Sequence, residues 1–223
     1  MSVGIAWPAA HVRGFDSDTP PTDAQLDAMG AEGITFVGGY PPVLGSNNPG
    51  TWPLDRFHAA RARGLATIAY VIAPPAPNGD AETLGTMTGY HLRALLDDPA
   101  WAAAVTVWAV DIEEDLWSAN AWWAVTYAGA LHRAQRDAWR LRGGAYGPVA
   151  CGAELATVPA PSRPAFPILA DWTPTIDLAH VPGLPDASWA GRRVAQWAGN
   201  LTFASLGVDA NVSQFDLHSL TAA

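Results

Sequence analysis

Residues 105–113 read VTVWAVDIE, and this stretch decides how the rest of the chain is interpreted. A short run rich in valine and other β-forming residues predicts a strand, whose successive side chains face opposite sides of the sheet. One face then carries Trp108, Val110 and Ile112. The other face carries, in order, Val107, Ala109, Asp111 and Glu113. This division is expected of a strand in a closed barrel, where the outer face packs on helices and the inner face lines the lumen.

Short strands followed by longer helical segments continue on both sides of this stretch. Helices are predicted from a capping box at Thr22 and Gln25, from about Pro53, from an N-cap at Asp80, and over 118–140. The last quarter of the chain has Pro-rich loops and little helical pattern. We therefore predict an α/β fold, an irregular (β/α)8 TIM-type barrel with trimmed helices in its last quarter. The other seven strand candidates are 12–16, 34–40, 65–73, 143–147, 166–172, 193–197 and 207–212.

Composition limits the number of domains and the class of partner. The chain has 223 residues, of which 49% are hydrophobic and 15% charged. One packed core suffices for this length, and the piece beyond a boundary near 159–167 would be too small to fold alone, so we expect a single barrel domain over 1–223. The net charge is −9 and the sequence contains no lysine. Nucleic acids and anionic membranes are therefore poor candidates as partners.

Metal and cofactor chemistry find little support in the sequence. Cys151 is the only cysteine, and the six histidines are scattered rather than grouped at the spacing of metal ligands. Glycine-rich phosphate-binding motifs and the Gly-x-Ser-x-Gly motif of serine hydrolases are absent from the sequence. We expect neither a metal nor a cofactor.

The N-terminal sequence bears on localisation. Residues 1–15, MSVGIAWPAAHVRGF, lack the charged and continuous apolar regions of a signal peptide. The longest apolar run, over 101–110, is about half the ~20 residues that a membrane-spanning helix needs. We expect a soluble protein that is cytoplasmic on synthesis, without membrane insertion.

Asp111 and Glu113 would both reach the lumen at the carboxyl end of their strand, the usual active-site rim of such barrels. Two strand residues place their Cα atoms about 6.6 Å apart, close enough to couple their protonation. An acid beside a carboxylate suits glycoside hydrolysis, because the leaving oxygen must be protonated while the sugar's developing positive charge is stabilised. Alternatively, the acidic run only caps the next helix, which is the role we assign to Glu114 and Asp115.

Two further acids fall at matching points of the chain. Asp16 ends the first strand candidate and Asp209 lies in the last, and in a closed barrel these two strands are neighbours. With Asp111 and Glu113 they would form an acidic cleft at the rim. Such a cleft favours a neutral or cationic substrate and repels phosphates.

Aromatic side chains near strand ends are candidate platforms for sugar rings, because the apolar faces of sugars stack on aromatic rings. Packing between helices and barrel is the competing explanation for them. Asp171 could hydrogen-bond a saccharide hydroxyl or lie in a surface loop. The aromatic candidates are Tyr40, Tyr70, Tyr146, Trp172 and Trp197.

Five segments carry a resemblance to a known family: GFD at 14–16, FVGGY at 36–40, AVDIE at 109–113, GAYG at 144–147, and VAQWAG with GVDANV between 194 and 212. Their order and spacing resemble the lysozymes of glycoside hydrolase family 25. They look even closer to the related glycoside-hydrolase-like domain of unknown function found in actinobacteria and phages. The last two segments add Gln196 and Asn211 as substrate-binding candidates.

The resemblance implies a muramidase-type activity on the β-1,4 bonds of peptidoglycan. It also implies action at a bacterial cell wall or membership of a phage virion, with virion proteins among the partners. It implies that Glu113 is the general acid/base and that Asp111 orients the 2-acetamido group of the substrate or acts as nucleophile. Asp16 and Asp209 would position sugar and water. The glycoside-hydrolase-like subgroup often has an arginine before the tyrosine of the second strand, where this chain has Gly39. This departure favours the alternative of a catalytically silent barrel with a carbohydrate-binding or structural role in a virion or at a cell surface.

Overall fold

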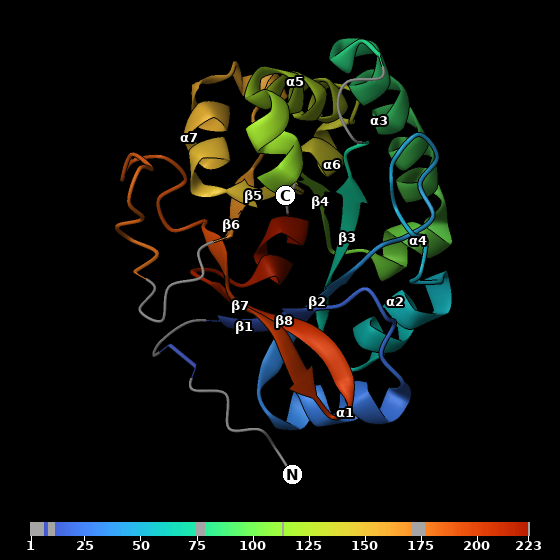
Figure 1. Cartoon of the computed structure of the whole chain (residues 1–223). Helices are drawn as coiled ribbons and strands as arrows, with labels where there is room; N and C mark the ends of the chain where they lie inside the picture. Colours follow the sequence, from blue (N-terminus) through green and yellow to red (C-terminus); the bar gives the residue numbers. More distant parts are fainter. Residues whose placement is uncertain (1–6, 9–11, 75–78, 113, 171–176, 223) are drawn as a thin grey trace.

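Eight strands close into a barrel in the order in which they follow one another along the chain (Figure 1). The computed structural model describes all residues except 1–6, 9–11, 75–78, 113, 171–176 and 223. The strands are β1 (Val12–Asp16), β2 (Ile34–Gly39), β3 (Ala66–Ile72), β4 (Val107–Asp111), β5 (Gly143–Pro148), β6 (Phe166–Ala170), β7 (Val194–Phe203) and β8 (Leu206–Ser213). The helices are α1 (Asp23–Ala31), α2 (Leu54–Ala62), α3 (Ala81–Asp97), α4 (Pro99–Ala104), α5 (Glu114–Arg133), α6 (Asp137–Arg140) and α7 (Val149–Thr157).

The sheet is parallel from β1 to β7, whereas β8 runs antiparallel to both of its neighbours, β7 and β1. This reversal follows from the short turn between β7 and β8, where Ala204 and Ser205 both adopt positive φ angles of 47° and 66°. Two such residues in succession form the tight turn that joins the strands of a hairpin. The prediction of an irregular (β/α)8 barrel is confirmed, with a hairpin in place of its last helical crossover.

The two faces of β4 are divided as the sequence predicts. Trp108, Val110 and Ile112 belong to the large cluster between the barrel and its helices. Val107 and Ala109 belong to a second cluster that fills the lumen. A period of two along one strand therefore separates the two cores of the molecule.

Several helix boundaries agree with the sequence signals. Thr22 and Gln25 form the predicted capping box of α1, and the Asp80 side chain accepts a hydrogen bond from the Thr83 N–H at the start of α3. Asp98 with Pro99, which reads as a helix break, also begins α4, because proline fits the first position of a helix and aspartate caps it.

The long helix predicted over 118–140 is interrupted. Helix α5 has non-helical dihedral angles at Asn120 and ends at Arg133, and the extended backbone of Arg136 precedes the separate short helix α6. Helix α7 was not predicted from the sequence. Its segment carries a helical face of small and apolar residues that include Cys151 and Leu155, both buried.

The segment between β6 and β7 contains no helix among its described residues, 177–193. Arg193 is buried there, and its guanidinium donates hydrogen bonds to backbone carbonyl groups of this segment. A single cation thereby satisfies carbonyls that a helix would otherwise pair internally. The accepting residues are Leu178, Ala179, Pro185, Asp186 and Ser188.

The C-terminal 3-10 helix η2 (Leu217–Ala222) closes the amino end of the barrel. This helix is the dark red one in Figure 1. Its residues Leu217 and Leu220 are buried in the lumen cluster, which also contains Phe166 at the start of β6. Among the described residues, the cavity that reaches the lumen lies at the carboxyl ends of the strands. This is the end at which Asp16 and Asp111 lie.

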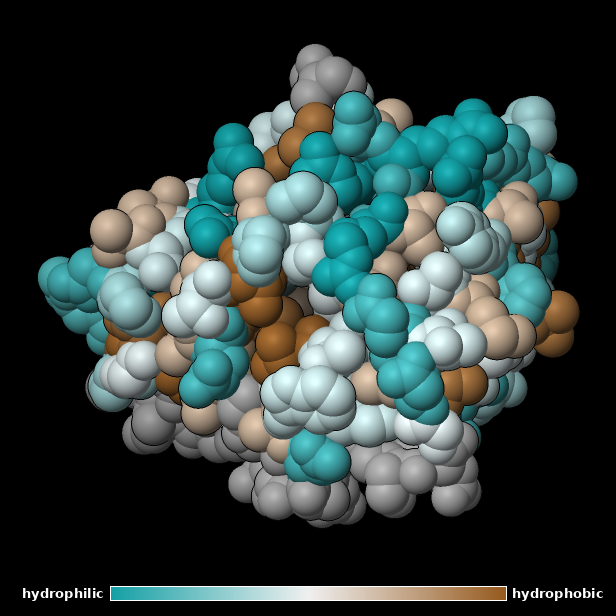
Figure 2. All heavy atoms as spheres, turned by 90° about the horizontal axis from the view of Figure 1, so that it is seen from above, coloured by the Kyte–Doolittle hydropathy of each residue, from teal (hydrophilic) through white to brown (hydrophobic). Residues whose placement is uncertain are grey.

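The surface in view in Figure 2 mixes hydrophilic residues with small, separate groups of hydrophobic ones. None of the helices in the described part of the chain is both long and apolar enough to cross a bilayer. The exposed large hydrophobic side chains are spread over several elements and are Leu44, Met87, Tyr90, Trp122 and Leu141.

Candidate active site

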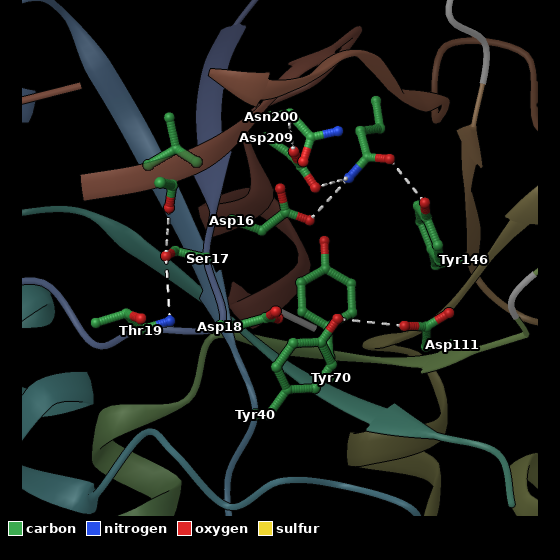
Figure 3. Close-up of a pocket in the computed structure, with 13 residues that line it drawn as sticks. Asp16, Ser17, Asp18, Thr19, Tyr40, Tyr70, Asp111, Tyr146, Asn200 and Asp209 are labelled. Atoms are coloured by element: carbon green, nitrogen blue, oxygen red, sulfur yellow. Dashed lines mark hydrogen bonds between the residues drawn. The ribbon is translucent and has the colours of Figure 1, made fainter. Parts of the chain in front are cut away.

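A cavity of about 360 Å³ opens at the carboxyl end of the barrel (Figure 3). Its walls come from β1 and the loop after it, from β2 to β5, and from the β7–β8 hairpin. The lining residues are Asp16, Ser17, Asp18, Thr19, Tyr40, Tyr70, Asp111, Tyr146, Gln196, Asn200, Gly207, Val208 and Asp209. Three of the four predicted catalytic acids thus share one cavity, while Glu113 lies outside the described residues.

Asp111 is the last residue of β4 and is only 2% exposed. One of its carboxylate oxygens, Oδ2, accepts a hydrogen bond of 3.3 Å from the hydroxyl of Tyr40, which directly follows β2 (Figure 3). The inner face of the barrel thus delivers this carboxylate to the cavity, where it is held by a tyrosine from the end of β2, two strands away in the barrel.

Asp16 and Asp209 lie directly opposite each other where β1 pairs with β8. The side-chain amide of Gln196 donates to both carboxylates, at 3.3 and 3.2 Å. Asn211 donates to the second oxygen of Asp16 at 2.9 Å, and the backbone N–H of Asn200 donates to Asp209 at 2.7 Å. Amide donors therefore hold two neighbouring carboxylates that would otherwise repel each other.

The environment of this pair disfavours two negative charges. Burial, and next the charge of Asp209, raise the pKa of Asp16 to about 7, although hydrogen bonds from Asn211 and Gln196 oppose the shift. Burial is also the main cause that raises the pKa of Asp209, while the Asn200 N–H lowers it. The carboxyl group of Asp16 therefore keeps its proton at pH values at which an ordinary aspartate has lost it.

Three tyrosines form an aromatic arc on the side of the cavity next to Asp111. The ring of Tyr70 lies 5.7 Å from that of Tyr40 and 6.3 Å from that of Tyr146, centroid to centroid. The hydroxyl of Tyr146 donates to the Gln196 carbonyl oxygen at 2.7 Å. Tyr70 is 1% exposed, and its hydroxyl has no hydrogen-bond partner among the described residues. Burial, with the charge of Asp16 as the next cause, raises the pKa of Tyr70 well above 10, so its hydroxyl stays protonated.

The prediction that Trp197 lines the sugar site is wrong. Because side chains alternate along β7, Gln196 faces the lumen and Trp197 faces outward. There its ring packs against Trp7, with 6.0 Å between the ring centroids. Asn211 is 1% exposed and does not line the cavity, so it holds Asp16 in place instead. Asp171 and Trp172 lie outside the described residues.

Sequence reasoning missed part of the cavity wall. Ser17 links three elements: its N–H donates to the Gly38 carbonyl, its hydroxyl donates to the Gly207 carbonyl, and its own carbonyl accepts from Trp52 Nε1 at 2.7 Å. Asp18 and Thr19 follow it at the cavity mouth. The sequence contains a sign of their role, because they closely follow Asp16 at the end of a strand and so lie at the active-site rim. Asn200 was not predictable in this way, because an irregularity in the β7–β8 pairing places its N–H on Asp209.

Gly39 is explained by the packing of Trp52. A Cβ atom at position 39 would overlap the indole ring of Trp52, which is buried at 1% exposure. The space that a larger side chain would need is therefore filled by a tryptophan that fixes the loop after β1 through Ser17.

The cavity was predicted to hold carboxylates and aromatic residues rather than a cluster of metal ligands. In the part of the chain that the structure describes, no group of three or more His, Cys, Asp or Glu side chains is placed to hold a metal ion. What the arrangement offers is a set of carboxylates with different protonation tendencies and tyrosine hydroxyls beside them. These groups can donate and accept protons and can stabilise developing positive charge.

No model of a known protein family matches the sequence, and no curated protein sequence matches it. Solved structures do share its fold. A lysozyme of family GH25 from Aspergillus fumigatus is 16% identical, with a TM-score of 0.64 over 95% of this chain and 99% of that chain. A muramidase from Acremonium alcalophilum is 18% identical, with a TM-score of 0.62 over 94% and 98% of the two chains. An uncharacterised protein from B. stearothermophilus is 17% identical, with a TM-score of 0.58 over 92% and 99%. The chain therefore has the same barrel fold as these proteins, one of which is a lysozyme of family GH25.

Proposed function

We propose that the protein is a peptidoglycan-degrading glycoside hydrolase of the muramidase type, which cleaves β-1,4 bonds next to N-acetylmuramic acid. The observation that carries this proposal is the convergence of Asp111 with the Asp16–Asp209 pair around one cavity. Barrel enzymes place their reacting groups at this end of the strands. The shared fold with muramidases adds support without fixing the activity.

In this proposal Glu113 is the general acid/base. The sequence places it two residues after Asp111, which is the period of one strand face. Asp111 orients the 2-acetamido group of the substrate or acts as nucleophile, and Asp16 and Asp209 position the sugar and the water. The proposed substrate-binding residues are Tyr40, Tyr70, Tyr146, Asp171, Trp172 and Gln196.

The test is the release of reducing ends from purified peptidoglycans by the wild type and by Glu113→Gln and Asp111→Asn. We expect each substitution to lower the rate at least about a hundredfold, because an acid-base group contributes roughly 10²–10⁴-fold. Glu154→Gln is the matched control, since it removes an exposed carboxylate on α7, outside the cavity, and should leave the rate unchanged. Equal rates in Glu113→Gln and the wild type would disprove the assigned role.

A second candidate function is that of a catalytically silent barrel that binds carbohydrate or serves a structural role in a virion or at a cell surface. The observation in its favour is Gly39, where the ring of Trp52 leaves no room for the arginine that the resembling subgroup often has at this position. This alternative predicts that no peptidoglycan releases reducing ends, while glycan binding or assembly into a larger particle is retained.

The proposed setting is the bacterial cell wall, with delivery as a phage lysin as the more specific form of the proposal. Binding to intact cell walls, compared between the wild type and Asp16→Asn, tests the first part.

We further propose that residues 1–223 form one barrel domain, because closure of the barrel uses strands from Val12 to Ser213. A single cooperative unfolding transition is expected.

A further inference from the structure

The charge of the cavity is one-sided. Carboxylates of Asp16, Asp18, Asp111 and Asp209 come from β1, the loop after it, β4 and β8. Among the lining residues that the structure describes, none is arginine, lysine or histidine. A ligand at this site therefore meets a field of one sign, which low-dielectric walls strengthen.

Most hydrogen-bond donors of the lining already serve the protein. The hydroxyl of Tyr40 donates to Asp111, and that of Tyr146 donates to Gln196. The Gln196 amide donates to two carboxylates, and the N–H of Asn200 donates to one of them. The cavity consequently offers a ligand mainly acceptor oxygens, which suits a ligand rich in N–H or O–H donors.

Tyr70 provides an independent sign that the cavity is built for a polar ligand. Its hydroxyl is buried without a hydrogen-bond partner among the described residues, and it points into the cavity toward Asp16 (Figure 3). Leaving a buried hydroxyl unpaired is costly, so this group is suited to a polar ligand atom in the centre of the cavity. Its oxygen can accept a hydrogen bond from an N–H group.

The Asp16–Asp209 pair distinguishes a charged ligand from a neutral one. These carboxylates repel each other across neighbouring strands, and the structure supplies them only with neutral amide donors. A neutral sugar leaves the repulsion in place, whereas a cation within about 4–6 Å favours the ionised form of both. Binding of a cation at neutral pH should therefore release the proton that Asp16 shares with solvent.

We propose that the cavity binds an amino sugar with a free, protonated 2-amino group, with the ammonium seated among Asp16, Asp209 and the hydroxyl of Tyr70. The substrate class is thus a glycan that is at least partly de-N-acetylated. The inference deepens the function proposed above and rests on the same cavity.

Calorimetric titration with two β-1,4-linked tetramers tests the proposal: one of glucosamine and one of N-acetylglucosamine, at pH 7 and low salt. We expect the glucosamine tetramer to bind at least about tenfold more tightly, with a difference that shrinks as salt is added. Equal affinity for the two tetramers, or tighter binding of the acetylated one, overturns the proposal.

Variants separate the cavity from the general negative charge of the protein. Asp18→Asn removes an exposed carboxylate at the cavity mouth, and we expect about threefold weaker binding of the glucosamine tetramer only. Tyr70→Phe should weaken the same tetramer about tenfold. Asp137→Asn removes an exposed carboxylate on α6 and is the matched control. Equal losses in Asp137→Asn and Asp18→Asn would mean non-specific attraction and would overturn the proposal.

Hydrolysis assays keep the two proposals apart. Peptidoglycan is assayed before and after chemical de-N-acetylation, alongside the binding experiments. Reducing ends released only from the acetylated material, without a preference for the glucosamine tetramer, would uphold the hydrolase and overturn the ammonium site. Tight binding of the glucosamine tetramer without release from either material would uphold the ammonium site and exclude the hydrolase.

Discussion

Gln196 connects the two sides of the cavity floor through both ends of its side-chain amide. Its carbonyl oxygen accepts from Tyr146, and its nitrogen donates to Asp16 and Asp209. Gln196→Met keeps a similar volume but removes the donor that favours the charged carboxylates. Because a hydrogen bond to a charged group contributes about 1.5 kcal/mol, we expect the pKa of Asp16 to rise by about one unit above its value near 7.

Carboxyl-carbon NMR titration of Asp16 measures this change directly. Tyr146→Phe is the control, since it removes the donor to Gln196 while leaving the amide beside both acids, and a smaller shift is expected. An unchanged pKa in Gln196→Met would show that the amide does not stabilise the ionised pair.

Gly39 leads to a prediction about packing. Gly39→Ala places a methyl group where the Trp52 ring lies, and we expect a loss of about 1–3 kcal/mol in the free energy of unfolding. In a Trp52→Ala background the same substitution should cost much less, because the space is then free. Urea unfolding of the four proteins in this double-mutant cycle measures the coupling, and additive losses would contradict the overlap.

At the scale of the element, β4 shows what the sequence can reveal. The alternation of Trp108, Val110 and Ile112 with smaller or acidic residues is local, so its period of two predicts both the outer core and the direction of Asp111. The same rule, applied to β7, would have shown that Gln196 and Trp197 cannot both face the cavity. A position near the end of a strand does not by itself show which face of the strand a side chain occupies, and for Trp197 that face is the outer one.

The direction of β8 could not be predicted in the same way. Ala204 and Ser205 lack the Asn-Gly or Asp-Gly signature of a two-residue hairpin turn, yet both adopt positive φ angles. The energetic reason is non-local, because β8 closes the barrel by pairing with β1 as well as with β7. Asp16 and Asp209 lie opposite each other because of that closure. The sequence predicts this proximity only from the order of the strands, since the first and last strands of a closed barrel are neighbours.

Arg193 yields a prediction for the segment between β6 and β7. Arg193→Met buries a side chain of comparable length without its donors and leaves the backbone carbonyls of five residues unpaired. We expect a loss of at least about 3 kcal/mol in the free energy of unfolding. Hydrogen exchange of residues 178–189 should become faster than that of the barrel strands. The neighbouring, exposed Arg192→Met is the control, and comparable losses in the two variants would contradict the assigned role.

At the scale of the whole molecule, the buried His132 and the half-buried Asp16 lie on opposite sides of the barrel wall and couple folding to pH with opposite signs. His132 on α5 is fully buried against Trp108, with 4.6 Å between the ring centroids. Burial, and next the charges of Arg140 and Arg133, lower its pKa from 6.5 to about 3. The unfolded chain thus binds more protons at this site, so His132 makes the fold less stable as the pH falls from about 6.5 to 3, by up to about 5 kcal/mol.

Asp16 acts in the other direction. Its pKa is about 7 in the folded protein against 3.8 as the ordinary value, so the folded chain binds the extra proton between these limits. The fold therefore loses stability as the pH rises from about 4 to 7, by up to about 4 kcal/mol, and the raised pKa of Asp209 adds to the same trend. Over their shared range the two slopes largely cancel.

We therefore expect the combined contribution of these two groups to the free energy of unfolding of the wild type to change little between about pH 4 and 7. Substituting either group alone should make the free energy of unfolding depend on pH. Relative to the wild type, His132→Phe should gain stability toward pH 4, because the group that the unfolded chain protonates is gone. Asp16→Asn should instead gain stability toward pH 7, because no charge is then buried beside Asp209. Urea unfolding of the three proteins at pH 4, 5, 6 and 7 gives the slopes, and the double variant should again be nearly level. Slopes of the same sign in the two single variants would rule out this opposition, whereas opposite slopes would mean that the lumen and the outer helical layer counterbalance each other in the response of the fold to protons.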